Sequence, residues 1–355
     1  MRITFLLSSL QLSGGEMLVM EYANRLADKG HQVTLVAPAG SVHPEQRAAL
    51  RASISVRESQ RARPETPTPF GLAALTLSLA RAIPPSDFLV ATHTPTLAPA
   101  WLGSRLLRRG RLIWLFMDYP EMFRGRPVEG TLLRLGPRLV DGIAAISAPL
   151  AEAASSRARC PVVRSGAGLP RRHLLYPPST PQPAPPKRIF YVGDARPRKG
   201  LVDFLAAADV VHRQHPDILL VIASKTPCSL STAAPVEFHL RPTDAELADL
   251  YRSSHLFVSA SWGEGLGYPP LEAMACGVPV VLTDSSGVRD YAVDGENCLM
   301  VPPHAPQALA AAMLRLLHES GLAARLVEGG LATAARYRWD DAADAFEELL
   351  KRSSF

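Results

Sequence analysis

The stretch "HLFVSASWGEGLGYPPLEAMACG", residues 255–277, decides how the rest of this chain is interpreted. Its first residues are apolar and short enough for a buried strand, while "PPLEAMACG" predicts a helix with proline in its first turn and glycine past its end. Two carboxylates, Glu264 and Glu272, therefore lie at or near a strand-to-helix turn. Glycines in such a turn let a ligand approach the backbone, and the helix N-terminus offers unpaired N–H groups to an anion.

The same alternation of strand and helix runs through both halves of the chain. In the first half, the apolar runs are "ITFLLSS" (3–9), "QVTLVAP" (32–38), "DFLVATH" (87–93), "RLIWLFM" (111–117) and "GIAAISA" (142–148). A second alternating series follows, with the apolar runs "RIFYVGD" (188–194), "DILLVIAS" (217–224), "HLFVSAS" (255–261) and "VPVVLTD" (278–284). The pattern predicts an α/β fold with two doubly wound, Rossmann-like parallel sheets that face a cleft, with ligand sites at the carboxyl ends of the strands.

A proline-rich segment separates the two series. "YPPSTPQPAPPK", Tyr176–Lys187, contains six prolines and cannot sit inside a sheet. We expect it to be the linker between a first domain, residues 1–175, and a second domain, residues 188–337.

Cysteine usage and the N-terminus bear on location. The four cysteines are scattered without metal-ligand spacing, so reduced thiols and no zinc site are expected. The N-terminal apolar run is short for a signal peptide and far short of a membrane span, and we interpret it as a first strand. These features predict a cytoplasmic protein.

Positive charge is concentrated in the first half. Residues 1–185 contain 22 Lys and Arg against 12 Asp and Glu, a net charge of +10, which leaves −5 for the remainder. The arginines cluster in "SRLLRRGRL", "FRGRP" and "RLGPRLV". Such a field can attract nucleic acid, an anionic membrane surface or a phosphorylated substrate. A solvated face of arginines without a ligand is the alternative.

Two further loops after strands have anion-binding chemistry. "SSLQLSGGEM" places Gly14 and Gly15 between the first strand and the first helix, where a backbone amide can reach a phosphate. "VGDARPRKG" places Arg196, Arg198 and Lys199 directly after the first strand of the second domain. Three cations at the end of a strand favour phosphate binding over a purely solvated loop.

Two other nucleotide-binding classes do not fit. The dinucleotide fingerprint requires a third glycine three residues after the second, but "GEGLGYPP" has Tyr268 at that position, followed by two prolines. No glycine loop is followed by the lysine of a P-loop.

With these residues in view, the sequence resembles the GT-B glycosyltransferases, in particular glycosyltransferase family 4. The resemblance covers nearly the whole chain. It is carried by "SGGEMLVMEYANRLADKGHQVTLV", "AAISAPLAEA", "SGAGLPRRHL", "YVGDARPRKGLVDFL", "ELADLYRSSHLFVSASWGEGLGYPPLEAMACGVPVV" and "DGENCLMVPP".

The resemblance implies roles for individual residues. Glu264 and Glu272 match the glutamate pair with which such enzymes hold the donor, the first near the sugar hydroxyls and the second at the nucleotide ribose. The amides of Gly265, Leu266 and Gly267 match the helix N-terminus that meets the diphosphate. Lys199 matches a lysine that contacts the same diphosphate, and Gly15 a glycine that approaches it from the first domain.

At two positions the chain departs from the family pattern. In the family an arginine commonly follows the "VG" turn, and here that position is Asp194. Arg196 or Arg198 can supply the positive charge of that arginine instead. The histidine near the transferred sugar is replaced by Met117. Asp118, Glu121 or His93 can take over that role, or catalysis proceeds on electrostatics alone; a histidine satisfied at a strand end is the structural alternative for His93.

The function implied is a retaining glycosyltransferase that moves a sugar from a nucleoside diphosphate sugar, with UDP- or GDP-sugars favoured, to an acceptor hydroxyl. No metal and no other cofactor is expected, because cations and amides can stabilise the leaving diphosphate. The expected acceptor is a glycan, a glycolipid or a small molecule, in cell-surface polysaccharide or glycolipid synthesis. An anionic inner membrane surface is a candidate partner, and nucleic acid is not expected. A sugar-nucleotide epimerase and a non-catalytic sugar-nucleotide-binding protein remain as alternatives.

The end of the chain predicts one more helix. "YRWDDAADAFEELLKRSSF", 337–355, begins near Trp339 and carries Ala342, Ala345, Phe346, Leu349 and Leu350 on one face. The resemblance implies that this helix, residues 338–355, returns to the first domain.

Overall fold

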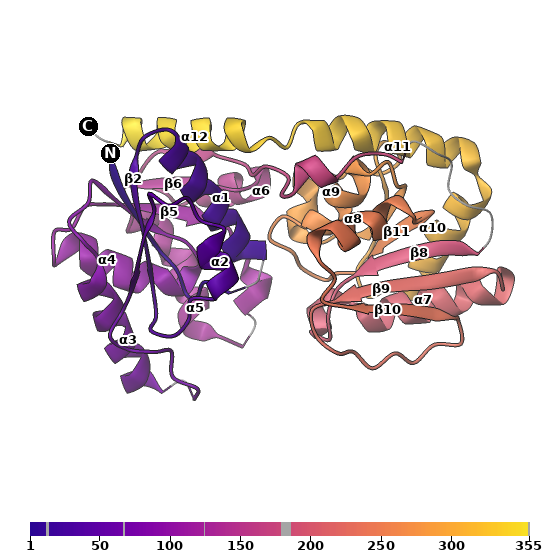
Figure 1. Cartoon of the computed structure of the whole chain (residues 1–355), viewed down its shortest axis with the longest axis horizontal. Coiled ribbons are helices and arrows are strands. Elements are labelled where there is room, and N and C mark those ends of the chain that lie inside the picture. Colours follow the sequence, from indigo (N-terminus) through magenta and orange to yellow (C-terminus); the bar gives the residue numbers. More distant parts are fainter. Residues whose placement is uncertain (12–13, 67, 124, 179–185, 354–355) are drawn as a thin grey trace. The chain divides into compact units, whose positions relative to one another are not determined.

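The computed structural model describes residues 1–11, 14–66, 68–123, 125–178 and 186–353, and it divides the chain into two compact units (Figure 1). Unit 1 comprises Met1–Pro170 together with Arg338–Phe355, and unit 2 comprises Arg171–Tyr337. Each unit is an α/β domain with its own parallel sheet. The predicted fold class of two Rossmann-like, doubly wound domains is therefore confirmed.

Unit 1 contains a seven-stranded sheet in the order β3-β2-β1-β4-β5-β6-β7, and all its pairs are parallel. Its central strands are buried on both faces, as expected from their uninterrupted apolar runs. The strands are β1 (Arg2–Leu6), β2 (Gln32–Ala37), β3 (Ser55–Glu58), β4 (Phe88–Ala91), β5 (Arg111–Phe116), β6 (Gly142–Ala145) and β7 (Val162–Arg164). The helices are α1 (Gly14–Asp28), α2 (Pro44–Ala48), α3 (Pro69–Ala82), α4 (Leu97–Arg105), α5 (Pro127–Leu135), α6 (Ala148–Ser155) and α12 (Trp339–Arg352).

Unit 2 contains a six-stranded parallel sheet in the order β10-β9-β8-β11-β12-β13. Its strands are β8 (Lys187–Val192), β9 (Ile218–Ser224), β10 (Val236–Leu240), β11 (Leu256–Ser259), β12 (Val280–Thr283) and β13 (Leu299–Val301). The helices are α7 (Leu201–Gln214), α8 (Asp244–Arg252), α9 (Tyr268–Ala275), α10 (Pro306–His318) and α11 (Ser320–Ala335). Helix α8 starts at a capping box in which Thr243 and Glu246 satisfy each other's backbone N–H groups.

The strand order of each sheet reverses direction at one point. In unit 1 the chain runs outward from β1 through β2 to β3, then returns to place β4 on the other side of β1. Unit 2 repeats this between β8 and β11. Ligands of open α/β sheets bind outside the carboxyl ends of the strands at such a switch point. The loops after β1, β4, β8 and β11 are therefore where a site is expected.

The chain first passes between the units at Pro170–Arg171, five residues before the predicted end of the first domain. The residues that follow already pack on unit 2, because residues 172–174 form a short 3-10 helix against α8 and the Arg252 guanidinium lies 4.5 Å from the Tyr176 ring centroid. The predicted linker, Tyr176–Lys187, begins inside unit 2, and its residues 179–185 lie outside the described residues.

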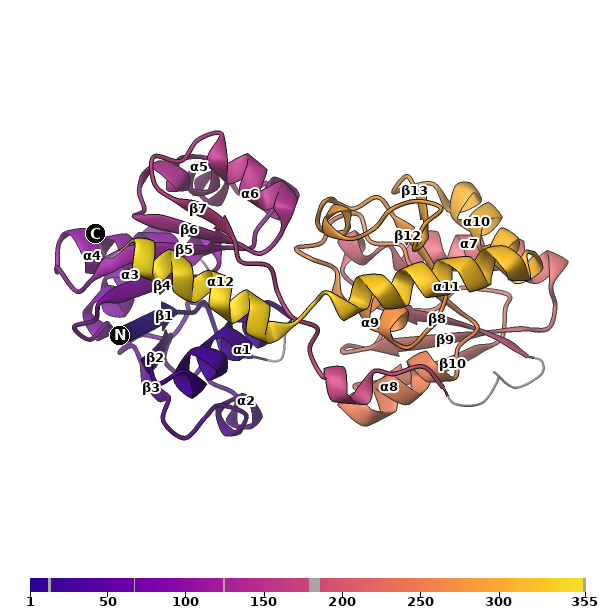
Figure 2. The same cartoon turned by 90° about the horizontal axis from the view of Figure 1, so that it is seen from above.

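Helix α12 belongs to unit 1, as the sequence predicted, and lies beside α1 in both views (Figures 1 and 2). Phe346 is fully buried and packs on Phe5 and Tyr22, with ring centroids 6.1 and 5.2 Å apart. Trp339 meets Tyr22 edge-on at 5.6 Å. The apolar face of α12 thus completes the core of unit 1.

No helix within the described ranges is both long and apolar enough to cross a bilayer.

Candidate functional site

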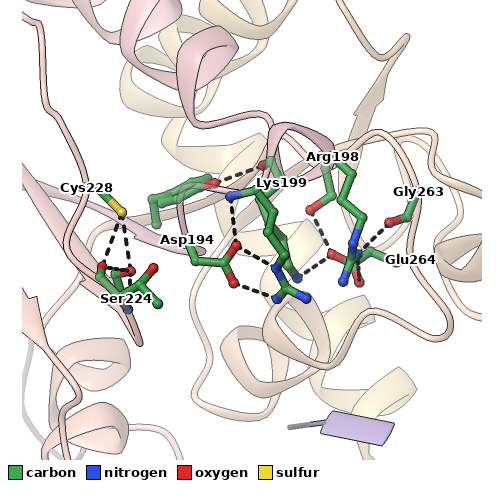
Figure 3. A network of polar contacts seen from close by, with 11 residues as sticks. Asp194, Arg198, Lys199, Ser224, Cys228, Gly263 and Glu264 are labelled. Atoms are coloured by element: carbon green, nitrogen blue, oxygen red, sulfur yellow. Dashed lines mark hydrogen bonds and ion pairs between the residues drawn. The ribbon is translucent and has the colours of Figure 1, made fainter. Parts of the chain in front are cut away.

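In unit 2, a charged cluster lies at the carboxyl ends of β8 and β11 (Figure 3). Lys199 Nζ donates a hydrogen bond to Glu264 Oε1 at 2.6 Å, and the Ser261 hydroxyl donates to the same oxygen at 2.8 Å. Arg198 donates to the Gly263 carbonyl at 3.0 Å and lies 3.5 Å from Glu264 Oε2. The structure therefore brings Arg198, Lys199 and Glu264 together.

A glycine fixes the loop that carries these cations. Gly200 has a φ of +67°, and a Cβ there would overlap the carbonyl oxygen of Ala260. Only glycine allows so close an approach to the end of β11 in this conformation. The Lys199 carbonyl also accepts a hydrogen bond from the Tyr191 hydroxyl at 2.8 Å. The backbone of Lys199 is thereby held between β8 and β11.

Glu264 is ionised in this cluster. Burial by itself would raise the pKa of the carboxyl group, but the charges of Lys199 and Arg198, with hydrogen bonds from Lys199 and Ser261, hold it below its ordinary value. Lys199 has three N–H donors and gives one to Glu264, so among the described residues two remain for an anion.

Glu272, on α9, is almost fully buried at 2% exposure, and both of its oxygens are engaged. Arg171 Nη2 donates to Oε1 at 2.5 Å and the Tyr251 hydroxyl donates to Oε2 at 2.8 Å. Arg171 also binds Asp244 at 2.7 Å. Burial opposes the charge on Arg171, but Glu272 and Asp244 outweigh it and raise the pKa of the guanidinium. Two of the carboxylate's roughly four lone-pair positions remain for a further donor.

The turn before α9 has the backbone that an anion site requires. Gly267 adopts a φ of +81° at the N-cap, and no side chain caps the helix there. Its carbonyl accepts from the Tyr291 hydroxyl at 2.7 Å, and the Leu266 side chain is buried, which anchors the turn. Gly265 and Gly287 approach so closely that a Cβ on Gly287 would overlap the Gly265 carbonyl. The amides of Gly265, Leu266 and Gly267 are thus presented by a rigid turn, whereas Pro269 and Pro270 in the first turn of α9 have no N–H to offer.

Arg196 is not directed at Glu264. It binds Asp194 through Nε at 2.8 Å and Nη2 at 2.5 Å. Burial favours the neutral form of Asp194, but Arg196 outweighs it and keeps the pKa of this carboxyl group below its ordinary value. Asp194 therefore neutralises Arg196 locally, and of the two arginines it is Arg198 that lies beside Glu264.

Sequence reasoning missed two cations of this cluster, Arg171 and Lys225. Lys225 directly follows β9, and loss of hydration followed by the charges of Arg171, Lys199 and Arg196 lowers the pKa of its ammonium group. Its position after a strand is the same signal that identified Lys199. Arg171 has a φ of +53° in "GLPRRHL", a stretch with no pattern that points to α9.

In unit 1, His93 and Asp118 meet at the carboxyl ends of β4 and β5. His93 Nδ1 lies 3.1 Å from Asp118 Oδ1, while Thr94 donates to Oδ2 through its amide at 2.6 Å and its hydroxyl at 2.8 Å. A carboxylate only accepts, so Nδ1 carries the proton and the neutral ring keeps its lone pair on Nε2. Burial opposes protonation of the ring, but Asp118 outweighs it and raises the pKa of His93.

The opposite edge of the imidazole faces the glycine turn after β1. A Cβ on Gly15 would lie 2.6 Å from His93 Nε2 and 3.8 Å from Met117 Sδ. Gly14 is the first residue of α1, and Gly15 follows it, so the helix begins beside the ring. Glu16, which the sequence reasoning also missed, is buried here and accepts from the Ser9 hydroxyl at 2.9 Å.

Of the two candidates for this role whose side chains the structure describes, His93 is more accessible than Asp118. Its side chain is 25% exposed, whereas that of Asp118 is 5% exposed, and Met117 is buried. Asp118 therefore lies behind His93 and orients it. The side chain of Glu121 is outside what the structure describes.

A hollow of about 360 Å³ lies on unit 1 beside α5, lined by Phe123, Gly125, Arg126, Pro127, Gly130, Thr131 and Arg134.

Two family models match the chain. Residues 12–166 match Glycosyltransferase Family 4 and residues 176–333 match Glycosyl transferases group 1. This chain belongs to the GT-B glycosyltransferases.

Curated relatives of this GT-B chain share part of its length. A D-inositol 3-phosphate glycosyltransferase of Streptomyces bingchenggensis is 36% identical over 125 residues, which is 35% of this chain and 28% of the relative. The protein of the same name from Thermobispora bispora is 29% identical over 192 residues, 48% of this chain and 45% of the relative. The matched stretch thus spans less than half of each relative.

Solved structures are similar over the full GT-B fold. Sucrose-phosphate synthase from Thermosynechococcus elongatus has a TM-score of 0.79 at 17% identity, over 99% of this chain and 98% of that chain. Anabaena HepE, solved in complex with UDP-glucose, has a TM-score of 0.76 at 18% identity, over 99% of both chains.

Proposed function

We propose that this protein transfers a sugar from a nucleoside diphosphate sugar to an acceptor hydroxyl, with retention of the anomeric configuration and without a metal ion. The observation that carries the proposal is the Lys199–Glu264 cluster at the switch point of unit 2, next to the turn of residues 265–267 that precedes α9. Family membership and the UDP-glucose complex of the similar Anabaena protein support a nucleotide sugar as the donor.

The donor residues divide by the chemistry they can supply. The open N–H groups of Lys199, with Arg198 and the amides at residues 265–267, suit a diphosphate. Glu272, whose side-chain oxygens accept hydrogen bonds from Arg171 and Tyr251, suits the ribose hydroxyls, and Glu264 suits a hydroxyl of the sugar. Negative charge grows on the diphosphate as the glycosidic bond breaks, so preorganised donors stabilise the transition state more than the ground state.

His93 is the proposed group of unit 1 that acts on the sugar. Its Nε2 can accept a hydrogen bond from a hydroxyl when the ring is neutral, and Asp118 fixes the tautomer that permits this. Retention follows in this proposal from attack on the face that the diphosphate leaves, with the departing phosphate taking the acceptor proton. No protein nucleophile is then required.

The proposed acceptor carries an anionic group. Arg126 and Arg134 line the hollow beside α5, and a guanidinium suits a phosphate through paired N–H donors. The names of the inositol 3-phosphate relatives point in the same direction. A cytoplasmic enzyme of glycolipid or polysaccharide synthesis, at the inner face of the plasma membrane, is consistent with this chemistry.

One experiment tests the proposal and its alternatives. The full chain is incubated with UDP- and GDP-sugars, with and without cell extract as the acceptor source, in the presence or absence of EDTA. We expect acceptor-dependent release of nucleoside diphosphate, an α-linked product from an α-linked donor by NMR, and turnover that EDTA leaves largely intact. Sugar isomerisation without transfer indicates the epimerase, and binding without either reaction indicates a non-catalytic protein. Loss of turnover with EDTA, restored by magnesium or manganese, contradicts the metal-free mechanism.

A further inference from the structure

We propose that one face of unit 1, formed by α3 and the end of α4, docks on an anionic membrane surface. This inference rests on the proposed function, because docking would bring the enzyme to an acceptor in the membrane. We call this face the α3–α4 surface and define it by four exposed apolar residues, Phe70, Leu77, Leu106 and Leu107.

Helix α3 presents Phe70 and Leu77 to solvent along one stripe, and Leu72, which is 44% exposed, on another side of the helix. Phe70 is 82% exposed and Leu77 is 43% exposed. They lie seven residues apart, or about two helical turns, so both project from the same side of the helix. Within α3, Leu79 and Ala80 are the residues that are buried. Large apolar side chains at such exposure have no role in the core of unit 1.

The stripe lies between two neighbouring segments. On one side, the Arg61 amide donates to the Ser78 hydroxyl at 3.2 Å, and a Cβ on Gly71 would lie 3.5 Å from Pro64. On the other side, α3 packs along α4, and Ile83 at the end of α3 fills the space beside Gly103 (Figure 1).

The residues that directly follow α4 are also apolar and exposed. Leu106 and Leu107 follow Gly103 by three and four residues and are 66% and 40% exposed. Exposed apolar residues therefore occur both on α3 and directly after α4, the helix that packs along α3. An exposed apolar face of this kind marks an interaction site more often than a random feature of the surface.

The charges around the α3–α4 surface select the partner. Residues 60–117 contain seven arginines and two acids, Glu65 and Asp87, and Asp87 is bound to Arg2 at 3.0 Å. Five of the arginines are exposed and form no ion pair with any described acidic side chain: Arg61, Arg63, Arg81, Arg108 and Arg111, the last of which donates to the Ser353 carbonyl. Apolar side chains framed by unpaired arginines fit the boundary between acyl chains and anionic headgroups.

The test measures binding of the full chain to vesicles by flotation. The vesicles contain phosphatidylcholine alone or phosphatidylcholine mixed with phosphatidylglycerol. The variants are Phe70→Ser with Leu77→Ser, and Arg108→Gln. Matched controls are Val202→Ser, which changes a residue 76% exposed on α7 of unit 2, and Arg325→Gln on α11. Circular dichroism confirms that each variant is folded.

We expect binding to anionic vesicles only, with a steep loss as salt increases. The apolar double variant should bind at least about tenfold more weakly, because serine does not gain the free energy that Phe70 and Leu77 gain on transfer from water into the membrane. Arg108→Gln should bind about fivefold more weakly, and both controls should bind as the wild type.

Equal binding to neutral and anionic vesicles, or undiminished binding by the apolar double variant, overturns the proposal. A dimer in analytical ultracentrifugation that the same variant abolishes assigns the surface to a second copy of the chain and also overturns it. Nucleoside diphosphate binding is measured in parallel by calorimetry. Vesicle binding without nucleotide binding refutes the proposed function and leaves the α3–α4 surface supported, whereas the reverse result refutes the surface alone.

Discussion

Lys199 is the residue on which the proposed donor site depends most directly. Its ammonium group is held by Glu264 at 2.6 Å and by a loop that Gly200 anchors to β11, so it meets a diphosphate without rearrangement of the backbone. A charge-assisted hydrogen bond of this kind contributes about 1.5–3 kcal/mol.

We therefore expect Lys199→Ala to weaken the binding of a nucleoside diphosphate by roughly 10- to 100-fold in calorimetry. Glu272→Ala should weaken it similarly if it holds the ribose. Lys187→Ala is the matched control, because Lys187 lies at the opposite end of the strand that precedes Lys199. Equal affinities in Lys199→Ala, Glu272→Ala and Lys187→Ala would remove the donor assignment.

The His93–Asp118 pair gives unit 1 a pH dependence that can be measured. The pKa of His93 is raised, so its contribution to stability is present below the unfolded value of about 6.5 and is lost as pH rises through the folded value. The pKa of Asp118 is lowered, so its contribution is present above about 3.9 and is lost as pH falls through the folded value. The pair therefore stabilises the fold most between these limits.

Asp118→Asn should reduce the free energy of unfolding most within that window, and NMR titration should show the pKa of His93 falling once the carboxylate is gone. Asp141→Asn, which removes an acid bound to Arg105 elsewhere in unit 1, should leave the His93 titration in place. An unchanged pKa of His93 in Asp118→Asn would show that the two side chains do not interact in solution.

Residue types in the turns predicted much of the candidate site, but not all of it. Lys199 and Glu264 follow strands that are adjacent in unit 2, so their meeting could be anticipated from the chain pattern. Arg171 could not be, because its contact with Glu272 joins residues 101 positions apart through a loop without periodicity. The tie between Arg196 and Asp194 also depends on a local turn that residue type alone does not specify.

At the scale of elements, the buried strands were predictable and the sheet edges were not. The runs predicted as strands correspond to β1, β2, β4, β5 and β6 in unit 1, and to β8, β9, β11 and β12 in unit 2. The four strands without a sequence prediction, β3, β7, β10 and β13, are the edges of the two sheets. Edge strands here are short or polar, as in "SVRE" and "VVR", because one side has no neighbour to pack against.

Helix α12 illustrates how an amphipathic pattern specifies a packing partner. Phe346 inserts between Phe5 and Tyr22 with no exposed surface, and Lys29 binds Asp344 and Glu347 beside it. Phe346→Ala should lower the free energy of unfolding of unit 1 by about 3–5 kcal/mol through lost burial and the cavity left behind. Glu348→Ala, at an exposed position of the same helix, should change it by less than about 0.5 kcal/mol.

Hydrogen exchange measures, separately for each unit, whether Phe346→Ala destabilises it. Amides of β1 and α1 should exchange faster in Phe346→Ala, while those of β8 and β11 should exchange as in the wild type. Uniform acceleration throughout the chain would mean that α12 stabilises more than the core of unit 1.

At the scale of the whole molecule, unit 2 is one uninterrupted segment, Arg171–Tyr337, whereas unit 1 is assembled from both ends of the chain. Unit 2 also contains the residues proposed to hold the diphosphate and the ribose of the donor, together with Arg171 and Tyr251, which orient Glu272. Residues of its six-stranded sheet and of its own helices together form its hydrophobic core. These features suit a segment that folds by itself.

We therefore expect residues 171–337, expressed alone, to unfold cooperatively and to bind a nucleoside diphosphate within about tenfold of the full-length affinity, which corresponds to 1.4 kcal/mol. The fragment should not transfer sugar, because His93, Gly15 and the proposed acceptor-binding arginines belong to unit 1. Calorimetry and the nucleotide-release assay measure the two properties separately.

The same fragment carrying Lys199→Ala is the control, and it should lose the affinity that the fragment retains. A fragment that is folded by circular dichroism yet binds no nucleotide would show that donor binding requires residues of unit 1, and the assignment of the donor to unit 2 alone would then be wrong.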